Sequence, residues 1–476
     1  MSGVIQRKRA IVLELGSLQT ALMLALSMVA SAQTAKIAVR QLPAASATST
    51  EELASIAAVR YLANGNVLVN DQTRHRVVLL DKDLKMVKLV ADSTSNTNNA
   101  YGVGRGGLIA YRGDSTLFLD PVALSMLVID PDGKIVRTMA APRPNDAQFM
   151  TVPSLGQPAF DAQGRLVYRM MDFGMRGMRF GAGGGPPQIP TPPDSSALVR
   201  FDLGTRKLDT LGYFKIPKTN ISVSQDDRGG MRVSVTLNPL PVVDEWTVLS
   251  DGTVAFVRGQ DYHVDFLDGS GKLTKAEKIP YEWQRMSDDD KMRFLDSAKV
   301  ALETARRTGG VGGMAAVFGG GGPGLGGDGP TRMTVTRGGD GPPRVETSGP
   351  APAAAAGNAV AKAGAEGAAA KGPENGGGNN MPPINMVNAS ELSDYKPVFS
   401  PSSVRADMDD RIWVRTIPTK PTPGGAIYDI IDRSGKLVDR VQVPAGTTIA
   451  GFGTGGIVFL GSRDDKGIHL QRIVLK

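Results

Sequence analysis

Short apolar segments joined by tight polar turns recur along this chain in six similar units. The first unit contains NGNVLVNDQTRHRVVLLDKDLKMV, residues 64–87, which reads as two short strands with polar turns before, between and after them. A single hairpin of this kind is only marginally stable in water, so the units must pack against one another. The six units cover residues 60–90, 107–139, 158–211, 245–279, 404–443 and 449–475.

An aspartate follows the third apolar segment in five of these units. In four of them a glycine comes shortly after, in DPDG, DLG, DGSG and DRSG. An Asp carboxylate accepts backbone hydrogen bonds in an Asx-turn, and Gly adopts positive φ without steric cost. We therefore expect turn residues and not metal ligands at Asp81, Asp130, Asp202, Asp268 and Asp432.

The spacing of the units predicts an all-β fold. Asp81 and Asp130 lie 49 residues apart, and periods of 40–50 residues with four strands each are typical of a β-propeller. The segments VVLLD and MLVID are apolar on both faces, as expected for blades packed between two neighbours. We predict a six-bladed propeller of four-stranded antiparallel blades, with blades one to four in 33–279 and blades five and six in 393–476.

The last unit has only three strands. The segment AKIAVRQLP, residues 35–43, is the nearest candidate for the missing strand. We expect it to pair with the last blade and to close the ring.

Two segments carry a resemblance to a known group of proteins. LSDGTVAFVRGQDYHVDFLDGSGK (249–272) and DMDDRIWVRT (407–416) resemble blades of the six-bladed NHL and TolB-like propellers, especially exported bacterial ones. The resemblance covers about 35–280 and 395–476 and implies the fold. It does not imply an activity, because propellers host binding proteins, lyases, lactonases and protease modules alike.

The N-terminus has the pattern of a signal peptide. Arg7–Arg9 supply positive charge, Leu18–Ala30 form an apolar run, and Ala30–Ala32 match a small-x-small cleavage site. The run is short for a bilayer span. We predict cleavage after Ala32 and a periplasmic or extracellular protein without a membrane span; an uncleaved anchor is the alternative, because Glu14 interrupts the pattern.

The composition restricts the possible partners and cofactors. The net charge of +7 falls to +5 without residues 1–32, and no lysine-rich or arginine–aromatic run occurs, so nucleic acid is not an expected partner. The chain has no cysteine, and its three histidines form no local metal motif. We expect a monomer without a cofactor.

Three segments interrupt the repeat. Residues 171–193 and 417–425 separate the second and third strands of blades three and five, and a long segment from about 280 to 395 separates blades four and five. We predict a helix within 280–307 and disorder in the Gly/Ala/Pro-rich 308–392, as a flexible insert or a tether. In four-stranded blades all these loops emerge on one face, where the channel opens.

Arginines recur on the same face. Arg169 and Arg415 each lie five residues past a turn residue, and Arg258 occupies nearly the same position in blade four. Such a rim could bind a carboxylate, a phosphate or an acidic polysaccharide; alternatively each arginine pairs locally with an Asp such as Asp71, Asp261 or Asp464. The candidate binding residues are Arg74, Arg169, Arg258, Asp261, His263, Arg415 and Arg463.

No catalytic motif stands out, so we predict a non-catalytic module that binds a protein, a peptide or an anionic glycan. The alternative is a metal-dependent hydrolase, because similar lactonase-type propellers hold a divalent ion such as calcium on their innermost strands. Asp244 and Glu245, which enter the first strand of blade four, are the candidate ligands. The corresponding residues Gln157 and Ser403 match poorly. A lyase would need channel histidines, which the sequence does not supply.

Overall fold

The computed structural model describes residues 37–94, 100–102, 104–171, 193–217, 220–225, 231–307, 332–336, 344–348, 384–419, 422–465 and 467–475. The chain divides into two units, Met1–Ala38 and Val39–Lys476. The predicted signal peptide, residues 1–32, lies outside the described residues. The second unit is described below.

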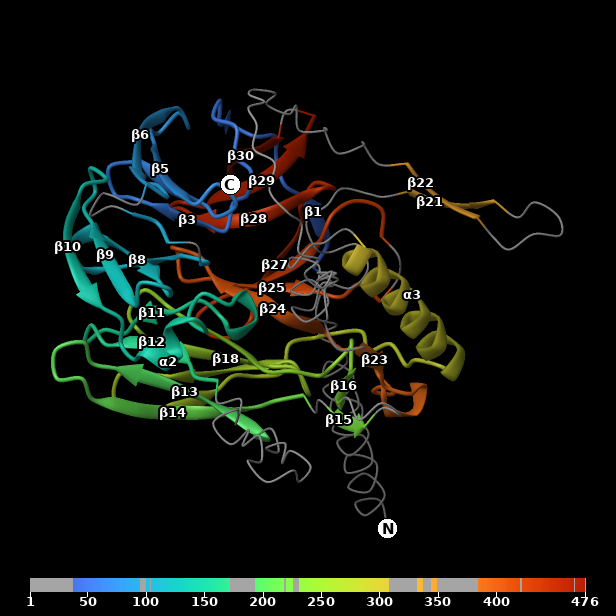
Figure 1. Cartoon of the computed structure of the whole chain (residues 1–476). Coiled ribbons are helices and arrows are strands. Elements are labelled where there is room, and N and C mark those ends of the chain that lie inside the picture. Colours follow the sequence, from blue (N-terminus) through green and yellow to red (C-terminus); the bar gives the residue numbers. More distant parts are fainter. Residues whose placement is uncertain are drawn as a thin grey trace, which may run out of the picture. The chain divides into compact units, whose positions relative to one another are not determined.

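Six antiparallel sheets form a ring, so the predicted six-bladed propeller is confirmed (Figure 1). Blades one to three consist of β3 (Ala58–Tyr61), β4 (Val67–Asp71), β5 (Arg76–Leu80), β6 (Met86–Ala91), β7 (Gly107–Ala110), β8 (Thr116–Asp120), β9 (Ser125–Ile129), β10 (Ile135–Ala140), β11 (Ala159–Phe160), β12 (Leu166–Arg169), β13 (Ser195–Phe201) and β14 (Leu208–Lys215). Blades four to six consist of β17 (Glu245–Val248), β18 (Val254–Arg258), β19 (His263–Leu267), β20 (Leu273–Lys275), β24 (Phe399–Ala406), β25 (Ile412–Thr416), β26 (Ile427–Ile431), β27 (Leu437–Gln442), β28 (Thr447–Phe452), β29 (Ile457–Asp464) and β30 (Gly467–Val474).

The hydrophobic core lies between the blades. Each of six buried clusters joins residues of neighbouring blades, for example Val257 with Val404 between blades four and five. Val69 of blade one shares a cluster with Phe459 of blade six, which closes the ring. The first strands of neighbouring blades contact one another, as β28 contacts β3 and β17 contacts β24, so these strands line the axis. Burial on both faces explains why the strand sequences are apolar on both sides.

The ring is closed by a different segment from the one expected. In the last blade, the fourth strand is β2 (Ala47–Thr48), which pairs with β30. Residues 35–43, predicted to fill this place, contribute β1 (Val39–Gln41), which pairs in parallel with β27 as a fifth strand of blade five. Arg40 Nε donates to Asp439 at 2.8 Å and Gln41 Nε2 donates to Gln442 Oε1 at 2.6 Å. Polar contacts of this kind at the sheet edge determine that β1 pairs with β27. The alternating apolar pattern of the sequence does not reveal such contacts.

The aspartate turns form as predicted. Asp81 Oδ1 accepts the N–H groups of Asp83 and Lys85, both at 2.9 Å. Asp432 Oδ1 accepts those of Ser434 at 2.8 Å and Lys436 at 3.0 Å, and Gly435 has φ of 80°. These backbone hydrogen bonds hold the pKa of Asp81 below its ordinary value. The turns between first and second and between third and fourth strands lie at one end of the blades, which we call the turn face.

The other end of the blades, the loop face, carries the second-to-third-strand loops and the connections between blades. It holds α2 (Pro144–Ala147), η2 (Pro153–Leu155) and α3 (Asp288–Arg307), which is the helix predicted within 280–307. Leu295 and Leu302 of α3 are buried, and Leu295 packs in a cluster with Leu240, Met286 and Val387. Among the described residues, no helix is long and apolar enough to cross a membrane.

Two features of the insertions were not predicted. A three-stranded sheet forms from β15 (Asn220–Gln225), β16 (Met231–Leu237) and β23 (Ile384–Met386), beside α3 in Figure 1. Parts of the segment predicted to be disordered, 308–392, form β-structure or 3-10 helix: β21 (Arg332–Thr336) pairs with β22 (Arg344–Ser348), and η4 (Ala389–Glu391) follows β23. The prediction of disorder relied on the Gly/Ala/Pro-rich composition of the whole segment, which obscured short runs with β-branched residues such as RMTVT. Most of 308–383 lies outside the described residues.

Candidate functional site

Five of the residues considered in the sequence analysis lie at the loop-face ends of blades three, four and five. Arg169 ends β12, Arg258 ends β18 and Glu245 begins β17, directly after Asp244, while Arg415 lies one residue before the end of β25. Because successive antiparallel strands reverse direction, all these ends lie on the same face. We call these five residues the arginine–glutamate cluster.

Glu245 is the most deeply buried member of the cluster, with 2% of its surface exposed. Burial raises the pKa of its carboxyl to about 8. Arg169, the backbone N–H of Ser402 and Arg415 oppose this increase, and Asp244 adds to it. At neutral pH the carboxyl is therefore mainly protonated and can donate a hydrogen bond.

Arg258 pairs with two aspartates of its own blade. Its Nη1 lies 2.9 Å from Asp244 Oδ2, and its Nε lies 2.8 Å from Asp265 Oδ2. Asp244 Oδ1 also accepts the N–H of Gly259 at 3.0 Å. These ion pairs hold the start of β17 against the end of β18. Because the two aspartates offset the charge of Arg258, its guanidinium is not available to bind an anion.

Arg169 and Arg415 differ from Arg258. Arg169 Nε donates to Ser196 Oγ at 2.5 Å, and its guanidinium carbon lies 4.8 Å from the centre of the Phe214 ring. Burial lowers the pKa of Arg169, and Glu245 and Asp244 counteract this effect. In the part of the chain that the structure describes, neither Arg169 nor Arg415 forms an ion pair within 4.0 Å. Two guanidinium groups without a close carboxylate therefore interact electrostatically with Glu245, which is mainly protonated at neutral pH.

Asp261 and His263 form a second set of contacts, which meets that of Arg258 at Asp265. Asp261 Oδ1 lies 2.7 Å from His263 Nδ1, and Asp261 Oδ2 lies 3.5 Å from Lys278 Nζ. His263 Nε2 lies 3.2 Å from Asp265 Oδ1. His263 is 4% exposed, and among the described residues neither its Nδ1 nor Asp265 Oδ1 makes a hydrogen bond, so these close approaches are not hydrogen bonds at those atoms.

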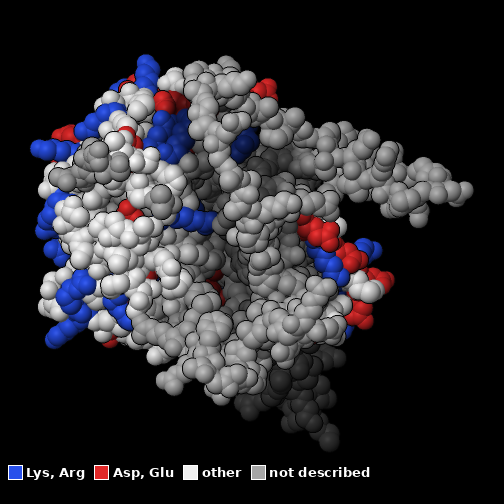
Figure 2. Space-filling model, viewed as in Figure 1, with Lys and Arg blue, Asp and Glu red and all other residues white. Residues whose placement is uncertain are grey.

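Arg74 and Arg463 lie in blades one and six. Arg74 Nη2 donates to Glu52 Oε1 at 2.8 Å, and Arg463 is opposite Ile468 in the β29–β30 pairing. Arg74 and Arg258 therefore pair locally, as one of the two alternatives predicted, but not with Asp71, Asp261 or Asp464. Asp71 pairs instead with Arg76, at 3.1 Å. Figure 2 shows Lys and Arg spread over the visible face, with acidic side chains beside several of them.

Asp244 and Glu245 do not form a metal site with a third residue. Within the described ranges, no group of three or more His, Asp or Glu side chains is arranged to hold a metal ion. The oxygens of Asp244 are used by Arg258 and Gly259. These residues do not fit the divalent ion that the lactonase alternative requires.

Ser402 was missed by the sequence analysis. It has φ of 66° in the innermost strand of blade five, where the β24–β25 register is irregular between Phe399 and Val404. Its N–H points at Glu245, and its Oγ is buried without a hydrogen-bond partner among the described residues. The proline in FSPSSVR was the available signal, because proline inside a strand marks a bulge. Strained residues of this kind cluster at functional sites.

The structure thus defines a six-bladed β-propeller with an arginine–glutamate cluster on its loop face.

No family model matches the chain, and no curated protein matches it. Three solved structures illustrate its similarities. A gluconolactonase from Xanthomonas campestris is 9% identical (91% of this chain and 99% of that chain covered, TM-score 0.35). A virginiamycin B lyase from Staphylococcus aureus is 11% identical (90% and 87%, TM-score 0.30). The calcium-binding protein regucalcin from Agrobacterium tumefaciens is 10% identical (92% and 98%, TM-score 0.36). These similarities are too low to assign an activity, and the propeller fold rests on the strand pairing above. The NHL and TolB-like resemblance stays a prediction.

Proposed function

We propose that this protein is a non-catalytic binding module whose loop face takes an anionic ligand: an acidic protein segment, a peptide or a glycan. The observation that carries the proposal is the placement of Arg169 and Arg415 beside a buried, mainly protonated Glu245, with no ion pair within 4.0 Å to either guanidinium among the described residues. A guanidinium offers several N–H donors in a fixed plane and binds carboxylate or phosphate in a bidentate manner.

The other members of the cluster have supporting roles in this proposal. The protonated carboxyl of Glu245 can donate a hydrogen bond to the ligand and does not compete with it for the two guanidinium groups. Asp244 and Arg258 neutralise each other and hold the strand ends in place. The site therefore keeps a net positive charge at neutral pH without an exposed lysine patch.

Isothermal titration calorimetry with two probes, trigalacturonate and a tetraglutamate peptide, tests the proposal. We expect Arg169→Gln and Arg415→Gln to weaken the binding of at least one probe by about tenfold or more, since each removes a charged donor from a desolvated site. The control is Arg74→Gln, which removes an arginine already paired with Glu52. Equal affinities of the wild type and both variants for both probes would refute the proposal.

We further propose export to the periplasm or beyond as a monomer. The support is the basic, apolar and ASA pattern of residues 7–32. Mass spectrometry of the protein from a fractionated bacterial host should give a mature chain that begins at Gln33. A chain that retains Met1 in the membrane fraction would favour the anchor instead.

A further inference from the structure

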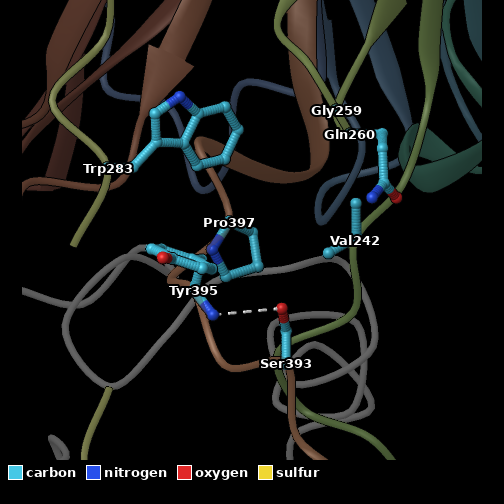
Figure 3. A pocket seen from close by; sticks show the side chains of 7 residues that line it. All are labelled: Val242, Gly259, Gln260, Trp283, Ser393, Tyr395 and Pro397. Atoms are coloured by element: carbon cyan, nitrogen blue, oxygen red, sulfur yellow. Dashed lines mark hydrogen bonds between the residues drawn. The ribbon is translucent and has the colours of Figure 1, made fainter. Parts of the chain in front are cut away.

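A cavity on the loop face is lined by none of the five residues of the arginine–glutamate cluster. Its volume is about 350 Å³, within the range of small-molecule sites, and it is lined by Val242, Gly259, Gln260, Trp283, Ser393, Tyr395 and Pro397. Figure 3 shows Trp283, Pro397 and Tyr395 on one side and Gln260 and Val242 on the other. The lining comes from blade four and from the insertion that follows it.

An isolated antiparallel β-bridge between two segments builds the aromatic wall. Met286 N–H donates to Asp394 O at 2.8 Å, and Lys396 N–H donates to Gln284 O at 2.9 Å, so Arg285 lies opposite Tyr395. Alternate residues of paired strands share a face. Trp283, Tyr395 and Pro397 therefore point to the same side, and the cavity lies there (Figure 3).

Trp283 is exposed but held in place by two successive edge-to-face contacts between aromatic rings. Its ring lies 5.3 Å from that of Tyr281 at 77°, and Tyr281 lies 5.8 Å from the buried Tyr262 at 81°. The Tyr281 hydroxyl donates to Ile417 O at 3.1 Å. Trp283 is 40% exposed, whereas Trp246 and Trp413 are at most 1% exposed. A rigidly held aromatic ring that faces an open cavity is a typical ligand contact.

The opposite wall is polar at its tip. Gln260 presents a side-chain amide, which both donates and accepts hydrogen bonds, and Ser393 adds a hydroxyl at the base. Gly259 makes this wall possible, since a Cβ there would lie 2.1 Å from Val243 O. The loop approaches the start of blade four more closely than any other residue would allow.

We infer that this cavity binds a sugar ring of an acidic oligosaccharide. A pyranose has an apolar C–H face that fits Trp283 and Tyr395, and hydroxyls at its edge that fit Gln260 and Ser393. Gln260 follows Arg258 by two residues, and Val242 precedes Asp244 by two, so two lining residues are near neighbours in the chain of the blade-four members of the arginine–glutamate cluster. The sugar's acidity rests on the proposed function, because the cluster would bind its carboxylates.

Trp fluorescence and calorimetry with trigalacturonate test the inference. The chain has three tryptophans, and only Trp283 is exposed, so bound trigalacturonate should protect wild-type fluorescence from acrylamide. Trp283→Ala and Tyr395→Ala should each weaken binding by about tenfold or more. Trp283→Phe should retain most of the affinity, and urea unfolding checks that all variants fold. The control is Tyr213→Ala, which removes a ring that is 67% exposed on β14.

The outcomes separate this inference from the proposed function. Trigalacturonate binding that depends on Arg169 and Arg415 but not on Trp283 or Tyr395 overturns the sugar pocket and leaves the proposed function standing. Binding that depends on Trp283 and Tyr395 but not on the arginines supports a sugar pocket and overturns the arginine site. Protection of Trp283 by tetraglutamate and not by trigalacturonate assigns the cavity to a peptide and overturns the inference.

Discussion

The two faces of the propeller are built from the ends of the same strands, but they differ in how completely their polar groups are used. On the turn face, aspartates such as Asp268 accept two backbone N–H groups each, and neighbouring blades interlock, as where Ser250 N–H donates to Asp410 at 2.6 Å. On the loop face, burial raises the pKa of Glu245 and so disfavours its ionisation. Ser402 Oγ lacks a partner among the described residues, and Trp283 faces an open cavity.

This difference indicates that the turn face contributes mainly to stability and the loop face mainly to binding. Satisfied polar groups stabilise the fold and have no capacity left for a ligand. Buried groups that are strained or lack a partner cost stability and persist where a ligand uses them. Changes on the turn face should therefore lower stability and leave binding unaltered, whereas changes on the loop face should alter binding and can even raise stability.

The largest effect is expected at Glu245. Its pKa rises from 4.5 in the unfolded chain to about 8 in the fold, so between these pH values the unfolded chain releases a proton that the fold retains. Stability thus falls as pH rises through this window, by an amount on the order of 5 kcal/mol. Glu245→Gln, which cannot ionise, should raise the free energy of urea unfolding markedly at pH 8 and little at pH 5.

The exposed Glu277, which lies outside the cluster, provides the control for this measurement. Glu277→Gln should leave the unfolding free energy unchanged at both pH values. A destabilising effect of Glu245→Gln at pH 8 would show that the carboxyl is ionised and paired in the fold, and the contrast between the faces would then fail.

The second effect is expected at Gly252 on the turn face. Gly252 has φ of 82°, and a Cβ there would lie 2.0 Å from the backbone nitrogen of Ala162 in the neighbouring blade. Gly252→Ala should lower the free energy of unfolding by about 3 kcal/mol through strain and inter-blade overlap, without weakening trigalacturonate binding. Gly271→Ala is the matched control: its φ is 87°, but nothing lies within 4 Å of the added Cβ, so it should cost only about 1 kcal/mol.

The turn face was largely predictable from the sequence, because its signals are local. An Asp followed by Gly after an apolar strand specifies a turn within a few residues, and the recurrence of that unit implied the propeller. The closing strand was assigned to the wrong blade, because β1 and β2 are short and their partners lie some 400 residues away, beside Arg440 and Gln471. A local pattern carries no information on such partners.

The loop face was predictable only in part. The similar positions of Arg169, Arg258 and Arg415 identified the correct strand ends, and Asp244 and Glu245 were selected for a role that the geometry does not fit. Which arginine is neutralised depends on Asp265, one strand away. The wall of Trp283 and Tyr395 depends on pairing across more than a hundred residues of insertion, which no spacing in the sequence reveals.

A third prediction concerns the pH dependence of binding. Protonated Glu245 leaves the charges of Arg169 and Arg415 available, whereas ionised Glu245 competes with the ligand for both. The affinity for trigalacturonate should therefore fall by several-fold, on the order of 1 kcal/mol, as pH rises from 7 to 9. Glu245→Gln should remove most of this dependence. An equal pH dependence in that variant would assign the effect to another group.

The smallest effect is expected at Asp432 on the turn face. Its Oδ1 accepts the Ser434 N–H at 2.8 Å, the Lys436 N–H at 3.0 Å and the Ser434 hydroxyl at 2.7 Å. Its pKa lies below the ordinary value, because these hydrogen bonds outweigh the opposing effect of burial. The stabilisation is thus present above the unfolded pKa and is lost as pH falls through the folded pKa. Asp432→Ala should lower the unfolding free energy at pH 7 by about 1 kcal/mol, and by less in acid, with trigalacturonate affinity unchanged. A loss of affinity as large as that of Arg169→Gln would mean that the two faces are coupled, because a turn at one end of blade five would then control a site at the other.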